Sequence, residues 1–359
     1  MLHGIMLLVM VHWFLISVTY LREISWLAIL GAGLLFLLGW LKRDGVKRAL
    51  AWLTQHKKGF LLGAIVFQLI VMVCAELLIR RDAAVVFKGA FELLKQSSIT
   101  NYLSRNPNNI PLFLYEKFFY VLFGSSGLWV MQVLNMLYVN LGAVLLYKLS
   151  QKHFNQKTAD LVYLFYVSLI CYSPYFYSMY TDIPPLPLIA LQLWWSLDLL
   201  KENQAGISWK KMFGLGILSG VTMLIRPTTI IVMIAFWAVL FFRGNWKVFG
   251  KIATVTVMTT GFVFAGLNTA VNHQRVVPIL KEEGLAKGPL LFINLGLTDM
   301  GHNQEDMKEG LLAYIDEDKR SDYNNGLFKK ENVIKEIKRR LKEYGPFGLV
   351  GHIYYKQSL

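Results

Sequence analysis

The sequence predicts an all-α membrane protein, a polytopic bundle of about nine transmembrane helices. Two observations lead to this prediction. Hydrophobic residues make up 55% of the 359 residues and the mean hydropathy is +0.43, which is too apolar for a soluble globule. Apolar runs of about 20 residues, the length that crosses a bilayer, also recur along most of the chain.

The charge pattern agrees with this fold class. A net charge of +14 would also suit a nucleic-acid partner, but the basic residues lie mostly in short patches between the apolar runs. Such patches are typical of cytoplasmic loops and of contact with anionic lipid headgroups, so we expect membrane lipids and no nucleic acid as partners. Cys74 and Cys171 both lie in apolar runs, which favours packing residues over a disulfide or a metal site.

The first two apolar runs are His3–Leu21 and Ser25–Leu41. The first has neither a basic n-region nor a small-residue cleavage pattern, so we interpret it as a retained helix and not as a signal peptide. The segment Lys42–Lys58 then carries the strongest positive cluster of any short loop. This cluster predicts a cytoplasmic loop and a cytoplasmic N-terminus.

The third run, Gly59–Ile79, must then leave the cytoplasm and place Asp82 outside. The remaining runs alternate so that the basic loops face inward and the turns near Tyr180 and Arg226 face outward. These runs are Leu128–Tyr147, Ala159–Tyr177, Pro184–Leu200, Met212–Ile225, Thr228–Phe242 and Ile252–Val271.

Four segments follow from this order. Residues 1–58 form an N-terminal membrane hairpin and a basic loop, and residues 59–271 form the membrane core with a large outer loop at 80–124. Residues 272–345 form a polar outer segment with an amphipathic helix from about Phe328 to Tyr344, ended by Gly345–Pro346. Residues 346–359 resemble the start of a further span, as if the chain were truncated or its end lay on the membrane.

The outer loop gathers the first candidate site residues. Asp82 directly follows Arg80 and Arg81, and a carboxylate near a membrane needs a partner or a role. Two interpretations stay open, a solvated helix end or a general base. Ala83–Lys95, which includes Lys88, resembles an interfacial helix.

A polar turn follows, and it carries further candidates: Tyr102, Arg105, Asn106 and Asn108. Pro107 and Pro111 bracket the turn and make it rigid. A simple connection between two surface helices and a substrate-binding role explain these residues equally well.

Two later segments reach the same outer face. Asp182 precedes Pro184–Pro185, which favours an N-cap and does not exclude a place in the site. Tyr180 ends a tyrosine-rich stretch that suits an interfacial aromatic belt or a wall on which a sugar ring stacks. Arg226 lies in an apolar stretch and needs an anion, either a phosphate or a carboxylate such as that of Asp182.

Upstream of Arg226, Gly216 and Gly220 form a GxxxG step, which predicts close packing against another helix and no chemistry.

The order Arg80-Arg81-Asp82, Tyr102 to Asn109, Tyr180-Thr181-Asp182 and Gly220 to Arg226 resembles the GT-C membrane glycosyltransferases. The resemblance covers about residues 59–271. It is strongest to a group of Gram-positive bacterial proteins related to the protein-mannosyltransferases and aminoarabinose transferases.

This resemblance implies transfer of a sugar from a polyprenyl-phosphate donor to an extracytoplasmic acceptor, a glycan, lipid or protein of the cell envelope. Asp82 would be the base, Arg226 would hold the lipid phosphate, and Asp182 would support the acceptor. Arg80, Arg81, Lys88 and Arg105 would share the electrostatic work. The chain departs from the family in its two extra N-terminal spans and in lacking an adjacent Asp-Glu pair in the outer loop. Whether a divalent metal takes part stays open.

Other classes remain. A secondary transporter would show broken helices and an internal repeat, which the sequence lacks, although Glu76 is an acid within a span. A non-catalytic membrane assembly partner would tolerate neutral replacements of Asp82 and Arg226. Another lipid-linked polysaccharide enzyme, a polymerase or ligase, would share the same outer face. The sequence does not identify the sugar, the acceptor or the oligomeric state.

Overall fold

The computed structural model describes residues 11, 42–75, 79, 81–177, 179–201, 208–282, 285–297 and 329–358. Within these ranges the regular secondary structure is helical and contains no strand, which confirms the all-α prediction. The expected spans His3–Leu21 and Ser25–Leu41 lie outside the described residues except for Val11. Arg80, Glu76 and all of residues 298–328 lie outside them as well.

The helices are given in chain order. They are α3 (Arg43–Gln55), α4 (Lys57–Cys74), α5 (Arg81–Ala90), α6 (Gln96–Arg105), η1 (Pro107–Asn109), α7 (Ile110–Phe123), η2 (Gly124–Ser126), α8 (Gly127–His153), α9 (Gln156–Tyr166), η3 (Val167–Cys171), η4 (Pro174–Tyr177), α10 (Leu186–Lys201), α11 (Trp209–Ile225), η6 (Pro227–Thr229), α12 (Ile230–Phe242), α13 (Trp246–Asn272), α14 (Pro289–Gly296) and α17 (Lys330–Ser358).

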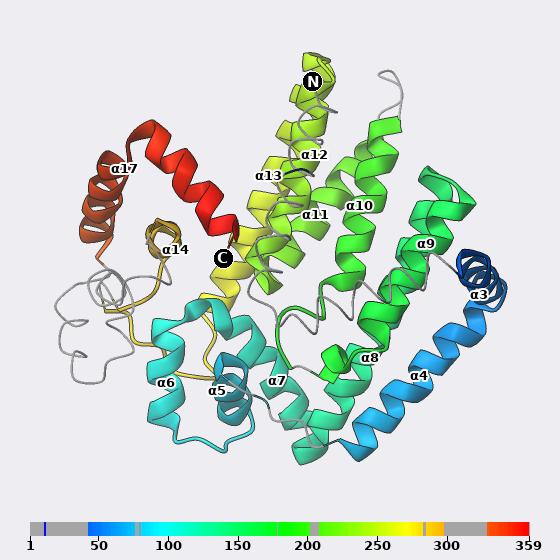
Figure 1. Ribbon diagram of the computed structural model, residues 1–359. Coiled ribbons are helices and arrows are strands. Elements are labelled where there is room, and N and C mark those ends of the chain that lie inside the picture. The colour runs from blue at the N-terminus through cyan, green and yellow to red at the C-terminus, as the bar shows by residue number, and fades with distance from the viewer. Residues whose placement is uncertain are drawn as a thin grey trace. The chain divides into compact units, whose positions relative to one another are not determined.

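The chain divides into two compact units. One consists of residues 1–46, 100–107 and 279–359, and the other of residues 47–99 and 108–278. The second unit, called here the helical core, contains α4, α5 and α7 to α13. Within it α8, α10, α11 and α13 lie side by side (Figure 1).

Three described helical stretches are long and apolar enough to cross a membrane: Lys57–Cys74, Pro107–His153 and Trp246–Asn272. Pro227–Phe242 is apolar but shorter. The 18 residues of α4 reach about 27 Å, close to the thickness of a bilayer core. The structure thus supports an apolar helical membrane protein, and the nine expected spans stay a prediction.

Two segments differ from the sequence-based expectation. Lys42–Lys58, expected as a loop, contains the helix α3. Ile110–Phe123, expected as a surface helix of the outer loop, is the apolar helix α7, which lies within the candidate membrane stretch Pro107–His153. Gly124 has a φ of +57°, which glycine adopts without strain, and it turns the chain from α7 into α8. A Cβ at Gly127 would lie 2.8 Å from the Phe119 carbonyl oxygen, so this glycine lets the two helices pack closely.

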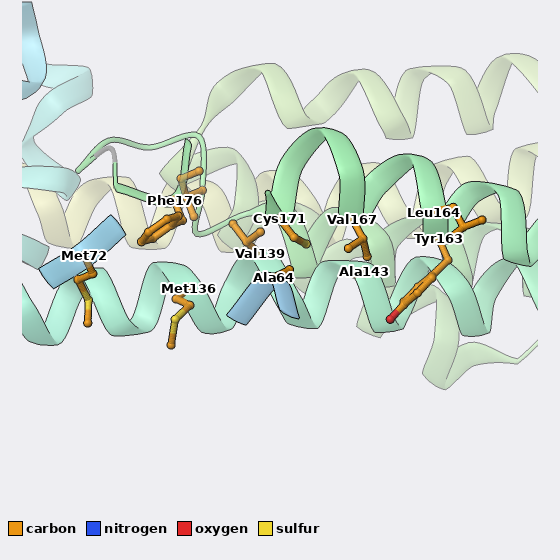
Figure 2. Packing of buried hydrophobic residues seen from close by; sticks show 11 residues of the cluster. Ala64, Met72, Met136, Val139, Ala143, Tyr163, Leu164, Val167, Cys171 and Phe176 are labelled. Atoms are coloured by element: carbon orange, nitrogen blue, oxygen red, sulfur yellow. The ribbon is translucent and has the colours of Figure 1, made fainter. Parts of the chain in front are cut away.

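One hydrophobic cluster of the helical core lies between α4, α8 and the α9–η3 segment. Figure 2 shows Val167 and Cys171 lying against Val139 and Ala143 of α8. The π-helical turn η3 interrupts the regular bonding of α9, and the side chain of Gln68 donates a hydrogen bond to the Cys171 carbonyl at 2.7 Å. Such a bond satisfies a buried carbonyl and fixes the turn.

The GxxxG step predicted from the sequence packs α11 against α13. A Cβ at Gly216 would lie 2.6 Å from Thr259, and one at Gly220 would lie 2.8 Å from Val263. Moving from Gly216 to Gly220 along α11 corresponds to moving from Thr259 to Val263 along α13, so the two helices run parallel. The Thr260 hydroxyl donates to the Gly216 carbonyl at 3.2 Å, which confirms the close approach.

In the other unit, α17 contains the segment expected as a helix and is interrupted where the sequence predicts its end, but Leu341 of the expected apolar face is 41% exposed and Arg340 is buried. Val333 is buried, and Gly345 interrupts the helix with a φ of +58° before Pro346. Beyond this kink the chain is helical to Ser358. The Tyr344 hydroxyl donates to the Leu297 carbonyl at 3.0 Å, which holds α17 against α14.

Candidate functional site

Arg226 stands at the break between α11 and η6. Pro227 cannot continue the helix, and the residue before a proline is pushed toward extended backbone. Arg226 accordingly has φ −143° and ψ 104°. Its side chain therefore leaves the end of α11 and is free to reach the segment that connects η4 to α10.

Three consecutive residues of that connection contact the guanidinium of Arg226. One nitrogen lies 2.9 Å from Asp182 Oδ1, and another donates to Thr181 Oγ1 at 3.0 Å. The ring of Tyr180 lies 5.6 Å from the guanidinium carbon, within the range of a cation–π contact. We call Tyr180, Thr181, Asp182 and Arg226 the arginine cluster.

The arginine cluster decides between two interpretations of its members. Helix α10 begins at Leu186, four residues after Asp182, so the expected N-cap role of Asp182 is wrong. Its carboxylate pairs with Arg226 instead, one of the alternatives that the sequence left open. The side chains of Arg226 and Asp182 are 33% and 32% exposed, so solutes can reach the pair.

Asp82 lies close to this cluster. Burial raises the pKa of the Tyr180 phenol, and the nearby carboxylate of Asp82 raises this pKa further, whereas Arg226 lowers it. Asp82 lies in the first turn of α5, where a helix dipole favours an anion. Val86 and Gly89, four and seven residues after Asp82, are buried. Asp82 therefore lies on the same face of α5 as these two residues, at the N-terminal end of that face.

An apolar cavity of about 370 Å³ opens beside the arginine cluster. Thr181 belongs to both, and Ile225, another lining residue, directly precedes Arg226. Its remaining walls come from α7, α8 and α10 with their preceding turns: Pro111, Leu112, Tyr115, Tyr138, Leu141, Pro184, Pro187, Leu188 and Leu191. The ion pair of Arg226 and Asp182 is therefore formed by the residues that directly follow two lining residues of an apolar cavity, Ile225 and Thr181.

Among the described residues of the helical core, the outer-loop candidates Arg81, Lys88 and Asn108 contact no member of this cluster. Arg80 lies outside the described residues. Arg81 is exposed and has a φ of +56°, a strained value for a residue with a Cβ. Lys88 is exposed and lies about 120° around α5 from Asp82. Asn108 is exposed, and its side chain donates to Asn109 Oδ1 at 3.4 Å.

Tyr102, Arg105 and Asn106 belong to the other unit, where they surround a lysine that the sequence did not indicate. Lys287 donates through its backbone to the Arg105 carbonyl at 2.9 Å and through Nζ to Asn106 Oδ1 at 2.8 Å. Asn106 also donates to the Tyr102 carbonyl at 3.0 Å. These contacts tie the segment around residue 287 to the end of α6, which is a structural role.

The sequence reasoning missed Glu116. This residue of α7 is fully buried, and neither carboxyl oxygen has a hydrogen-bond partner among the described residues. The signal was a glutamate within an apolar run, which passed unnoticed because Ile110–Phe123 was taken for a surface helix. Gln132 of α8 is also buried, and its amide nitrogen has no partner in the described part of the chain.

No curated protein and no solved structure matches the chain significantly. Within the described ranges, no three His, Cys, Asp or Glu side chains gather in a way that could hold a metal ion. One family model matches residues 8–359, almost the whole chain, and its description is that of an integral membrane protein. The chain belongs to this family, described as conserved hypothetical integral membrane protein.

Proposed function

We propose that the protein is a membrane glycosyltransferase that moves a sugar from a polyprenyl-phosphate donor to an acceptor on the same side of the membrane. One observation carries the proposal: Arg226 pairs with Asp182, Asp82 acts on the neighbouring Tyr180, and the residues before Arg226 and Asp182, Ile225 and Thr181, line an apolar cavity.

The donor explains why such a combination is needed. A polyprenyl phosphate has an apolar chain that stays in the bilayer and an anionic phosphate at its surface. The cavity beside Ile225 and Thr181 suits the apolar part that adjoins the phosphate. A guanidinium binds phosphate oxygens through two parallel hydrogen bonds, which suits Arg226 to the phosphate.

The carboxylates account for the chemical step. Asp82 takes the proton of the acceptor hydroxyl, whose oxygen attacks the anomeric carbon of the sugar. The bond between that carbon and the phosphate oxygen breaks, and its electron pair leaves with the phosphate. Arg226 stabilises the charge that grows there. Asp182 forms an ion pair with Arg226 in the structure. When the phosphate replaces this carboxylate at the guanidinium, Asp182 can bind the acceptor.

The test compares membranes that contain the wild type, Asp82→Asn or Arg226→Ala at equal protein levels. Release of free polyprenyl phosphate is followed from a panel of radiolabelled polyprenyl-phosphate sugars, with a membrane extract as acceptor. We expect each variant to lose about a hundredfold in rate or more. Lys157→Ala and Asp44→Asn remove the same charges from exposed positions elsewhere and should keep full activity. No turnover by the wild type across the panel, or full activity of Asp82→Asn, contradicts the proposal.

Glu116 favours a second candidate function, secondary transport. An acid buried within a candidate membrane segment often marks the path of a proton or ion, and Glu116 lies within the stretch Pro107–His153. Replacing it by Gln separates the two functions. If the protein is a transporter, Glu116→Gln abolishes proton-driven uptake into vesicles. If it is a glycosyltransferase, the wild type drives no such uptake and Glu116→Gln releases polyprenyl phosphate at a rate near that of the wild type.

A further inference from the structure

The adjoining ends of α11 and α13 carry an excess of positive charge. The two helices run parallel, and Lys251 of α13 lies 4.6 Å from the ring centre of Trp209, the first residue of α11. Figure 1 shows α11 and α13 side by side. Trp209, Lys210, Lys247 and Lys251 lie in the first two turns of these helices and therefore at the same end of the pair. We call these four residues the basic end.

The lysines of the basic end have no acidic partner among the described residues. Lys210 and Lys247 are exposed, and no ion pair within the described ranges involves them or Lys251, whereas the neighbouring Lys211 lies 3.5 Å from Asp198. Neither α11 nor α13 has an acidic residue in its first turn. Cations near the first turn of a helix oppose its dipole, so this arrangement costs stability unless an anion offsets it.

An apolar stripe continues from the basic end along α11. Trp209, Phe213 and Ile217 follow one another at intervals of four residues, and each is about half exposed, at 51%, 49% and 48%. Residues at this spacing lie on one face of a helix. Tryptophan favours the boundary between headgroups and acyl chains, so the stripe leads from the headgroup level into the hydrocarbon.

We propose that the basic end and the stripe Trp209–Phe213–Ile217 together bind one anionic phospholipid. The phosphate lies between Lys210, Lys247 and Lys251, and an acyl chain lies along the stripe. A free anion would contact the lysines alone and leave the apolar stripe uncovered, whereas a phospholipid contacts both. The proposed ligand is therefore a lipid with a negatively charged headgroup, such as phosphatidylglycerol. This proposal does not depend on the proposed enzymatic function.

The experiment measures the retention of lipid by the full chain. The protein is placed in phosphatidylcholine nanodiscs and titrated with phosphatidylglycerol, and native mass spectrometry counts the lipids that remain bound. The test variant is Lys210→Gln/Lys247→Gln/Lys251→Gln. The matched control, Lys58→Gln/Lys148→Gln/Lys157→Gln, removes three exposed lysines from α4, α8 and α9. We expect the apparent affinity for phosphatidylglycerol to fall about fivefold for each lysine removed from the basic end and to stay near the wild-type value in the control.

Two further variants separate the lipid from other anions and from misfolding. Replacing the same three lysines by Arg should keep phosphatidylglycerol binding, which shows that charge and not a folding defect is responsible. Phe213→Asn/Ile217→Asn should weaken retention of phosphatidylglycerol. Equal losses in the test and control variants, or equal competition by soluble glycerol phosphate, would overturn the proposal.

Discussion

Asp182→Asn tests the arginine cluster most directly, because it removes the carboxylate with which the phosphate of the proposed donor would compete. In the wild type, Asp182 Oδ1 lies 2.9 Å from a guanidinium nitrogen of Arg226. The asparagine keeps the size of the side chain and an oxygen acceptor but loses the charge. Arg226 keeps its hydrogen bond to Thr181 at 3.0 Å, so its side chain stays in position.

The size of the effect follows from the exposure of the pair. Both side chains are about one-third exposed, and ion pairs of this kind contribute about 0.2–1 kcal/mol. A phosphate that no longer has to displace a carboxylate gains this free energy. We expect Asp182→Asn to bind polyprenyl phosphate about 1.4 to 5 times more tightly than the wild type.

Binding is measured with purified protein in nanodiscs, with a polyprenyl phosphate as ligand and the uncharged polyprenol as reference. Asp198→Asn is the control, because Asp198 also pairs with basic side chains, Lys152 at 2.7 Å among them, and contacts no member of the arginine cluster in the described ranges. Weaker binding of the phosphate by Asp182→Asn than by the wild type refutes the assignment of Arg226 as the phosphate group's partner.

Three further predictions follow from the structure. In Asp82→Asn the pKa of Tyr180 should fall, because a negative charge that raises it is removed. The phenolate then forms at lower pH, which tyrosinate absorbance shows when Tyr180→Phe is subtracted. Gly216→Ala should cost about 1–3 kcal/mol in thermal unfolding because its Cβ would meet Thr259 at 2.6 Å, whereas Gly261→Ala, where no atom lies within 4 Å, should be neutral or stabilising; equal effects would disprove the close approach. Glu116→Leu should raise the midpoint of thermal unfolding, since it replaces a buried carboxyl without a partner in the described part of the chain; a lower midpoint would show that the carboxyl stabilises the fold.

Composition and periodicity predicted the helices well where one apolar run makes one helix. The runs Met212–Ile225 and Thr228–Phe242 correspond to α11 and α12 within a few residues, because Pro227 marks the break between them. The same reasoning failed for α3, where lysines and arginines at every turn resembled a loop although Val46, Leu50 and Leu53 keep the helical spacing.

The site was predictable in its parts and not in its assembly. Asp82, Asp182 and Arg226 drew attention because each is a charge at the end of an apolar run, where burial needs a partner. Nothing in the spacing shows that Asp182 meets Arg226, since 43 residues of the chain lie between them, as the numbering gives directly. The cavity could not be predicted from the sequence, because the residues that line it come from helices that are far apart along the chain.

The geometry of the arginine cluster has a consequence for the order of binding. Tyr180, Thr181 and Asp182 are consecutive, and all three contact one guanidinium, so a phosphate that takes Arg226 disturbs the whole segment at once. Asp182 cannot neutralise Arg226 and receive an acceptor hydroxyl at the same time. If the protein is the glycosyltransferase proposed above and its donor phosphate binds first, the phosphate supplies the negative charge that Arg226 needs and releases Asp182 for the acceptor. In the proposed reaction, the paired arginine of the structure corresponds to the state before the donor arrives, in which the Asp182 carboxylate is held by Arg226.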